Sequence, residues 1–168
     1  KKRKNQIFLL DVVEKLKEKV NKKIKLIICG HGRLEDVLKA RVKELGIEEN
    51  IIFAGYRNDL YSILSLGDIF LFSSLQEGLP VAVMEAMATG LPVVCSSVRG
   101  NLDLIDDKMG GYTVESFDSG LWCDLIYGLL MDGNKIKSFG EYNLEKIKSY
   151  DRSIVEKKMR RIYEFYER

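Results

Sequence analysis

The fold is decided by residues 69–95, which read IFLFSSLQEGLPVAVMEAMATGLPVVC. Residues 69–72 are apolar without polar alternation, a pattern typical of a strand that is buried on both faces of a sheet. A polar loop leads from this strand to an apolar helix predicted at residues 80–88, which ends at Gly90. Residues 93–95 then begin a second apolar strand. A strand, a helix and a strand in this order predict two parallel strands joined by a crossover helix.

The same alternation continues on both sides of this stretch. Further strands are predicted at residues 25–29 and 51–54, and further helices at residues 6–19, 34–45, 59–66, 121–131, 135–150 and 152–167. Asp59 is expected to cap the helix that follows it. Strands that alternate with helices predict an α/β domain with one open, doubly wound parallel sheet of Rossmann type. No strand is predicted after Ser119, so an α-helical tail is expected over residues 119–168.

Length and composition suit one ordinary globular domain over residues 1–168. A domain typically has about 150 residues, and the chain has 168. It carries 27 Lys and Arg against 25 Asp and Glu, a net charge of +2 that is too balanced for a protein that binds nucleic acid through a basic surface. No apolar run approaches the roughly 18 residues of a membrane-spanning helix. Three widely spaced cysteines and one histidine form neither a disulfide framework nor a zinc site, so we expect a reducing cytoplasm and no metal.

The loop and helix at residues 77–85 hold the candidate binding groups. Gly78 lets the backbone approach a ligand, and the N–H groups at the start of the following helix offer a site for phosphate. Glu85 is the one charge on an otherwise apolar helix, so we expect it to be buried and paired, for example with the hydroxyls of a ribose. Glu77 is at most about 12 Å away at helical rise, which would let it hold a sugar. From spacing alone, Glu85 could equally be a solvated or structurally paired residue and Glu77 a loop charge.

Four motifs occur in a fixed order between residues 30 and 90, within a resemblance that covers roughly residues 4–166. They are Gly30-His-Gly-Arg-Leu, Ile52-Phe-Ala-Gly55 followed by Asp59, Asp68-Ile-Phe-Leu-Phe-Ser-Ser, and Glu77-Gly-Leu-Pro with Glu85-Ala-Met-Ala-Thr-Gly90. With these motifs in this order, the chain resembles the C-terminal, donor-binding half of a family 4 retaining glycosyltransferase of the two-domain GT-B architecture. The resemblance implies a UDP- or GDP-linked hexose or N-acetylhexosamine as the donor, bound without a metal ion or other cofactor.

The resemblance also implies a biological setting and a missing partner. Enzymes of this kind assemble bacterial capsule, exopolysaccharide or lipopolysaccharide in the cytoplasm, in some cases in peripheral contact with the inner membrane leaflet. The N-terminal, acceptor-binding domain of the family lies outside residues 1–168, as does the arginine that normally accompanies its phosphate-binding lysine. We therefore expect the chain, which starts without Met, to be cut from a longer protein, to bind donor weakly and not to transfer sugar alone.

Individual residues take roles from the same resemblance. Glu77 would bind the hexose hydroxyls of the donor, and Glu85 the ribose hydroxyls. Lys4 would neutralise the diphosphate as it leaves, where negative charge grows in the transition state; the alternative for Lys4 is a disordered terminal charge. Glu77 and Lys4 are thus the catalytic candidates. The other donor-binding candidates, which act mainly through the backbone, are Gly30, Tyr56, Arg57, Gly78, Leu79 and Val81.

Two other functions remain open for this sequence: a regulatory binding module and a dinucleotide oxidoreductase. A stand-alone module that binds a nucleotide sugar for regulation would need the same residues without catalysis. A dinucleotide oxidoreductase fits poorly, because the motif at Gly30 lacks the third glycine of its fingerprint and no acidic residue ends the strand at residues 51–54.

Arg99 could meet phosphate or pair with Asp103 or Asp106. The apolar stripe of the last helix, with basic residues between, suits a domain interface or contact with anionic lipid.

Overall fold

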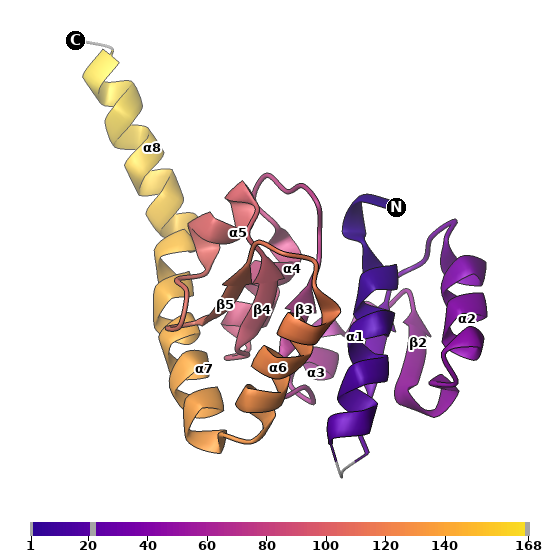
Figure 1. Cartoon of the computed structure of the whole chain (residues 1–168). Coiled ribbons are helices and arrows are strands. Elements are labelled where there is room, and N and C mark those ends of the chain that lie inside the picture. The colour runs from indigo at the N-terminus through magenta and orange to yellow at the C-terminus, as the bar shows by residue number, and fades with distance from the viewer. Residues whose placement is uncertain (1, 21–22, 167–168) are drawn as a thin grey trace.

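The computed structural model describes residues 2–20 and 23–166 of the chain and shows an α/β arrangement (Figure 1). The strands are β1 (Leu26–Cys29), β2 (Ile51–Gly55), β3 (Phe70–Phe72), β4 (Val93–Ser96) and β5 (Gly111–Val114). The helices are α1 (Gln6–Lys19), α2 (Glu35–Glu44), α3 (Leu60–Leu64), α4 (Val81–Ala88), α5 (Arg99–Leu104), α6 (Ser119–Leu130), α7 (Gly133–Ile147) and α8 (Arg152–Tyr166). Short 3-10 turns lie at Lys2–Lys4, Glu48–Asn50 and Lys148–Tyr150. None of the helices in the described residues combines the length and the hydropathy needed to cross a membrane.

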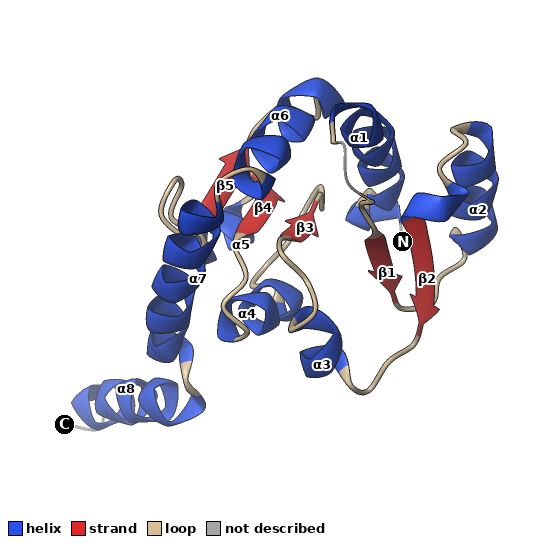
Figure 2. Cartoon of the chain, turned by 90° about the horizontal axis from the view of Figure 1, so that it is seen from below, coloured by secondary structure: helices blue, strands red, loops and turns tan. Residues whose placement is uncertain are grey.

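The strands form two parallel sheets, with the order β1-β2 in one and β3-β4-β5 in the other. The prediction of α/β structure with parallel strands is confirmed, but the prediction of a single continuous sheet is wrong. The edge of β1 and the edge of β3 do not pair within the described residues, and Figure 2 shows the two sheets apart from each other. Residues of both strands line a cavity of about 1000 Å³. Apolar side chains from both strands and from α1 line this cavity.

Two short elements escaped the sequence patterns. Strand β5 and helix α5 lie in a region where no element was predicted, because four and six residues are too few to show a period. Strand β5 runs so close to β4 that a Cβ atom on Gly111 would lie 1.8 Å from the carbonyl oxygen of Val93. Glycine therefore allows the pairing that starts this strand.

The region predicted as a helical tail is in large part core. Helix α6 packs along α1, where Trp122 is fully buried and meets Phe8 edge-on with the ring centroids 5.2 Å apart. Helix α7 packs against α4, and a Cβ atom on Gly140 would lie 2.2 Å from the carbonyl oxygen of Gly90. Only α8 extends away from the rest of the chain, and the side chains described on it are exposed (Figure 1).

Candidate functional site

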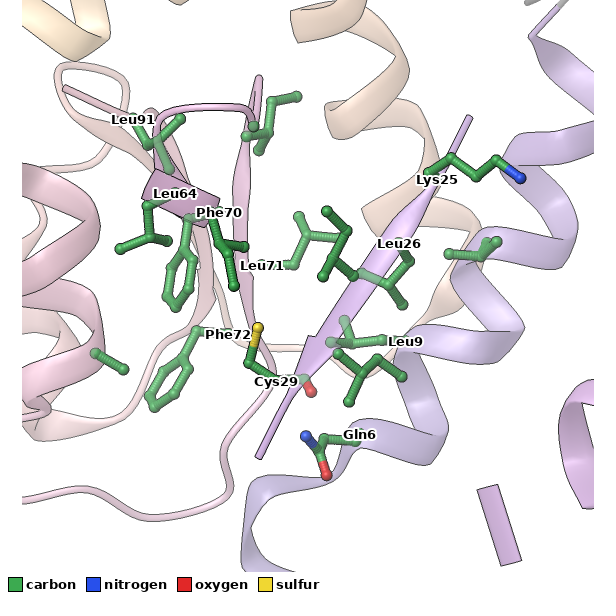
Figure 3. Close-up of a pocket in the computed structure, with 18 of the residues that line it drawn as sticks. Gln6, Leu9, Lys25, Leu26, Cys29, Leu64, Phe70, Leu71, Phe72 and Leu91 are labelled. Carbon is green, nitrogen blue, oxygen red and sulfur yellow. The ribbon is translucent and has the colours of Figure 1, made fainter. Parts of the chain in front are cut away.

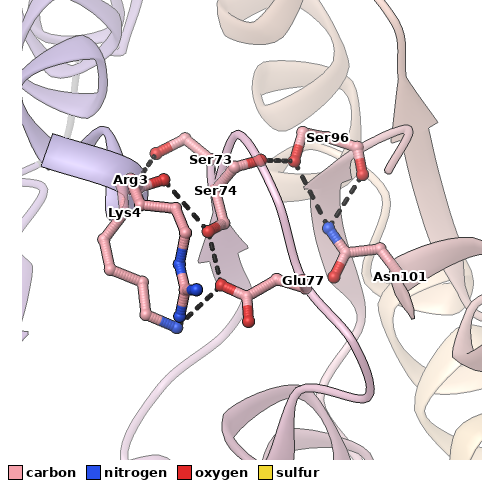
Figure 4. Close-up of polar contacts among 7 residues, drawn as sticks. All are labelled: Arg3, Lys4, Ser73, Ser74, Glu77, Ser96 and Asn101. Atoms are coloured by element: carbon pink, nitrogen blue, oxygen red, sulfur yellow. Dashed lines mark hydrogen bonds and ion pairs between the residues drawn. The ribbon is translucent and has the colours of Figure 1, made fainter. Parts of the chain in front are cut away.

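The carboxyl end of β3 carries two buried serines that bind the N-terminal segment. Ser73 Oγ donates a hydrogen bond to the carbonyl oxygen of Asn5 at 3.0 Å, and Ser74 Oγ lies 3.1 Å from that of Arg3. The backbone N–H of Leu75 also donates to Arg3 O at 2.8 Å. These bonds hold residues 3–5 against the loop that follows β3, although the two segments are far apart in sequence (Figure 4).

Lys4 is thereby placed beside Glu77. Its Nζ lies 2.8 Å from Glu77 Oε1 and 4.6 Å from the centre of the Phe72 ring. Ser74 Oγ donates to the same carboxylate oxygen, as Figure 4 shows. Only 8% of the Glu77 side chain is exposed, against 36% for Lys4. The structure thus places Lys4 in an ion pair, against the alternative of a disordered terminal charge, whereas the catalytic roles of Lys4 and Glu77 stay predictions.

The ion pair keeps Glu77 ionised. Burial by itself raises the pKa of this carboxyl group, but the hydrogen bonds from Lys4 and Ser74 and the charge of Lys4 lower it by more. The pKa of Glu77 therefore lies below its ordinary value. A carboxylate in this state accepts hydrogen bonds and donates none, which suits the hydroxyls of a polar ligand.

A buried layer under the loop fixes its position. Ser96 Oγ donates to the carbonyl oxygen of Ser74, and Asn101 Nδ2 donates to Ser96 O at 2.8 Å. Gly100 lies against the loop itself, since a Cβ atom there would be 1.9 Å from the carbonyl oxygen of Gly78. No role was predicted for Gly100 or Asn101 individually; a glycine and an asparagine within five residues of the end of an apolar strand were the available signal.

Helix α4 begins next to this pair and presents free backbone donors. Pro80 is its N-cap residue and provides no side-chain hydrogen bond to the first turn. The backbone N–H groups of Val81 and Ala82 therefore point out of the start of the helix. This end is also the positive end of the helix dipole. Leu79 and Val81 are 48% and 64% exposed, and Gly78 is exposed as well. These three predicted donor-binding residues thus lie together at an end that favours an anion.

Glu85 differs from its prediction. We expected a buried, paired carboxylate, but the side chain is exposed. The reason is the direction of the apolar face: Val83, Ala86 and Met87 are buried, and position 85 lies to one side of them. Glu85 nevertheless lines the same cavity as Lys4 and Gly30.

The loop at Gly30 is held by the loop after β2. The N–H of Gly30 donates to the carbonyl oxygen of Gly55 at 2.6 Å, and the N–H of Tyr56 donates to His31 Nε2 at 3.2 Å. Gly55 has a φ of 64°, and a Cβ atom there would be 3.1 Å from the His31 ring. His31 thus links the two loops while its side chain stays 67% exposed.

The side chains of Tyr56 and Arg57 lie at the surface, outside the cavity. Tyr56 is 77% exposed, and Arg57 donates two hydrogen bonds to Asp59, at 2.8 and 2.6 Å. The hydrogen bond from Arg57 lowers the pKa of Asp59. The predicted helix cap is therefore wrong, because the Asp59 carboxylate binds Arg57 and makes no cap bond to α3. Neither Tyr56 nor Arg57 lines the cavity that Gly30 and Glu85 share.

The remaining candidate cation on this side, Arg99, is the first residue of α5 and is exposed. Asp106, a suggested partner, pairs instead with Lys146 at 2.8 Å.

Over residues 2–20 and 23–166, no three His, Cys, Asp or Glu side chains gather closely enough to hold a metal ion. The positive groups near Glu77 include the Lys4 ammonium, Arg3, whose charge also lowers the pKa of Glu77, and the start of α4, and together they can hold a phosphate group.

The cavity joins this polar end to an apolar interior. Strands β1 and β3 form its walls together with α1, and Leu9, Leu26, Leu71 and Phe72 are among the side chains drawn in Figure 3. Its polar lining includes Lys4, His31, Ser73 and Glu85. Lys4, His31 and Ser73 lie at the carboxyl ends of β1 and β3, where ligands bind in open α/β sheets, whereas Lys25 and Asp68, which also line the cavity, precede these strands.

Comparison with known proteins gives consistent similarities. The family described as "Glycosyl transferases group 1" matches residues 1–146. The putative glycosyltransferase EpsD of Bacillus subtilis is 26% identical over 163 residues, which are 97% of this chain and 42% of the relative. An Escherichia coli UDP-Gal:alpha-D-GlcNAc-diphosphoundecaprenol alpha-1,3-galactosyltransferase is 36% identical over 93 residues, 55% of this chain and 24% of the relative.

A solved structure extends the likeness to three dimensions. The S. aureus protein TarM, crystallised as a mutant in complex with fondaparinux, alpha-GlcNAc-glycerol and UDP, superposes with a TM-score of 0.86 and 28% identity. The match covers 94% of this chain and 32% of TarM. The chain thus spans less than half the length of the proteins that it matches here.

Proposed function

Because this chain belongs to the glycosyl transferases of group 1, we propose that it binds the nucleotide-diphospho-sugar donor of a transfer reaction. Its fold is that of the C-terminal, Rossmann-like domain of GT-B glycosyltransferases. The reaction that we propose for the complete protein moves a hexosyl or N-acetylhexosaminyl group with retention at the anomeric carbon. The acceptor is bound by a second domain outside residues 1–168.

The observation that carries this proposal is the Lys4–Glu77 pair next to the start of α4. An ammonium group and free helix N–H groups attract a diphosphate, and a carboxylate beside them accepts hydrogen bonds from sugar hydroxyls. In the described part of the chain, both polar contacts of Glu77 end on Oε1. Oε2 is therefore available for the sugar without loss of the ion pair.

The chemistry follows from where charge develops. Transfer breaks the bond between the anomeric carbon and the diphosphate oxygen, and the leaving diphosphate gains negative charge. Lys4 and the N–H groups near Val81 stabilise that charge more strongly in the transition state than in the bound donor. Glu85, on the cavity side of α4, binds the ribose hydroxyls, and the loops at Gly30 and Tyr56 approach the donor from β1 and β2.

We favour UDP over GDP as the nucleotide of the donor. TarM was crystallised with UDP, and the E. coli relative is named for UDP-Gal and for a lipid-diphosphate-linked acceptor. These names support a role in bacterial polysaccharide assembly, in the cytoplasm and close to the inner membrane leaflet.

Titration calorimetry of the chain with UDP and with GDP tests the proposal. We expect saturable binding of UDP, and weaker binding of UDP by Lys4→Met. UMP serves as the control, because it lacks the second phosphate that Lys4 would meet. Equal heats for UDP and UMP, or no binding of either diphosphate at millimolar concentration, would contradict the assignment of a diphosphate site.

A further inference from the structure

Buried polar side chains gather at one end of the sheet formed by β3, β4 and β5. In the described part of the chain, five polar side chains are buried, namely Ser73, Ser74, Ser96, Asn101 and Asn143. The first three lie at the carboxyl ends of β3 and β4, and Asn101 lies in α5, which follows β4. Burial of a polar group is costly unless the group is hydrogen-bonded. The bonds that each of these side chains makes therefore indicate why it is there.

The two buried asparagines use their amide groups in the same way. Asn101 Nδ2 donates to the carbonyl oxygen of Ser96 at 2.8 Å and lies 3.3 Å from Ser96 Oγ. Asn143 Nδ2 donates to the carbonyl oxygens of Leu91 and Gly110, at 2.8 and 2.7 Å. In both residues Oδ1 is buried and has no hydrogen-bond partner among the described residues. Each asparagine thus serves as a donor only.

The asparagines differ in the end of the sheet that they bind. Leu91 and Gly110 precede β4 and β5, so Asn143 joins the amino ends of these strands. Its Oδ1 packs against Gly110, where a Cβ atom would lie 2.0 Å away. Asn101 binds Ser96, the last residue of β4, at the carboxyl end where ligands bind in sheets of this kind. A role toward a ligand is therefore open to Asn101 and not to Asn143.

Asn101 acts where the pairing of β3 with β4 ends. The last pair of the ladder is Phe72 with Cys95. One residue further along β4, Ser96 Oγ donates to the carbonyl oxygen of Ser74. A hydroxyl group has one hydrogen, so the Asn101 amide, as a donor to Ser96 Oγ, directs that hydrogen to Ser74. Asn101 therefore orients the side chain that holds the loop after β3.

The same loop brings Ser74 to Glu77, as Figure 4 shows. Ser74 Oγ is within hydrogen-bond distance of Glu77 Oε1, which also accepts a hydrogen bond from Lys4 Nζ at 2.8 Å. Gly100, next to Asn101, lies against this loop as well, since a Cβ atom there would be 3.2 Å from the carbonyl carbon of Glu77. Among the described residues, no hydrogen bond joins Asn101 directly to Lys4. Any effect of Asn101 on the ion pair therefore passes through the loop.

We propose that Asn101 is a positioning residue for the Glu77 carboxylate. Its amide orients Ser96, Ser96 holds Ser74, and Ser74 together with Lys4 holds Oε1 of Glu77. The consequence for a ligand rests on the proposed function: with Oε1 fixed in this way, Oε2 meets a hydroxyl of the donor sugar. Asn143, with the same pattern of bonds at the opposite end of the sheet, has no such effect.

A double-mutant cycle tests the positioning without any ligand. Lys4→Met is made in the native chain, in Asn101→Leu and in Asn143→Leu, because leucine is close to asparagine in shape and donates no hydrogen bond. Urea denaturation gives the equilibrium constant of folding for each protein. We expect Lys4→Met to lower this constant about fivefold in the native chain and in Asn143→Leu, but less than twofold in Asn101→Leu. Residues that share no partner are expected to contribute independently.

Ser96→Ala provides a second route to the same result, also in the case that Asn101→Leu does not fold. This variant removes one hydroxyl group and leaves the carbonyl oxygen of Ser74 without its donor. The effect of Lys4→Met should shrink in Ser96→Ala as it does in Asn101→Leu. An undiminished effect of Lys4→Met in either variant would overturn the positioning role. An effect that shrinks equally in Asn143→Leu would also overturn it, because general loosening of the sheet would then be the cause.

Calorimetry separates this role from the proposed function. The ligands are UDP and whichever of UDP-glucose, UDP-galactose and UDP-N-acetylglucosamine the native chain binds most tightly. We expect Asn101→Leu to bind the UDP-sugar about tenfold more weakly and UDP less than twofold more weakly, and Asn143→Leu to match the native chain. Equal losses for UDP and the UDP-sugar would overturn the role toward the sugar. No binding of UDP by the native chain would contradict the proposed function itself, whereas the cycle would still decide whether Asn101 positions Glu77.

Discussion

Lys4 and Glu77 are separated by 73 positions in sequence, yet Lys4 Nζ and Glu77 Oε1 lie 2.8 Å apart. In Figure 4, this pair is the ion pair that links the N-terminal segment to the loop before α4. It places a cation, a carboxylate and a helix N-terminus at one point. Its contributions to stability and to ligand binding can therefore be measured by separate substitutions.

Loss of the Lys4 charge should destabilise the folded chain. Lys4→Met leaves Glu77, which is 8% exposed, without its charged donor. We expect the free energy of unfolding to fall by about 1 kcal/mol, at the low end for a charged hydrogen bond because Lys4 is partly exposed. Urea denaturation measures the change. Lys2→Met is the control, since it removes the same charge from an exposed position; equal losses in the two variants would contradict a specific role for the pair.

The ion pair also predicts a dependence of stability on pH. The pKa of Glu77 is lowered in the folded chain, so its contribution is present above the ordinary pKa of 4.5 and is lost as pH falls through the lower, folded value. Glu77→Gln cannot titrate there. We therefore expect the stability difference between the native chain and Glu77→Gln to shrink between pH 5.5 and pH 3, as followed by urea denaturation. A difference that stays constant over this range would show that the carboxylate is not paired in solution.

Glu85 should affect ligand binding but not stability. Its side chain is exposed, and Glu85→Ala removes no buried contact. Hydrogen bonds from ribose hydroxyls to a carboxylate are worth about tenfold in affinity, so we expect UDP to bind Glu85→Ala about that much more weakly in calorimetry. Glu18→Ala, an exposed glutamate on α1, is the matched control. Unchanged UDP affinity in Glu85→Ala would remove this residue from the proposed site.

Gly100 should be essential for the position of the loop. A Cβ atom at Gly100 would lie 1.9 Å from the carbonyl oxygen of Gly78, so Gly100→Ala must displace backbone. We expect a loss of about 1–3 kcal/mol, as for other overpacked sites, together with weaker UDP binding. Gly128→Ala is the opposite case, because Gly128 lies exposed in α6 with open space around its Cβ position, and it should stabilise the chain by about 1 kcal/mol. Thermal and urea denaturation of both variants test this contrast.

The sequence was most informative where elements are long or strongly apolar. The unit around residues 69–95 formed with boundaries close to those predicted, because an apolar strand and a helix of eight residues each leave a clear pattern. Helix α5 and strand β5 left none, although α5 provides the Gly100 contact on which the loop rests.

The errors at Glu85 and Asp59 have a common origin. Composition showed that α4 is apolar, but which side of the helix faces the core depends on packing with β3 and α7. In the same way, Asp59 was near both a helix start and Arg57, and the guanidinium was the stronger partner. Pairing between β1 and β3 is also non-local, so no local pattern could reveal that these edges stay apart.

The serines at the end of β3 have a consequence for which substitutions this segment will accept. Ser73, Ser74 and Leu75 bind carbonyl oxygens of residues 3–5 and no side chain of Arg3. Many residues at position 3 should therefore preserve the segment, whereas Asn5, with a φ of 49°, admits few besides asparagine and glycine. We expect a library randomised over residues 3–5 to accept many residues at position 3 and to retain lysine at position 4. At position 5 we expect it to retain residues that adopt a positive φ.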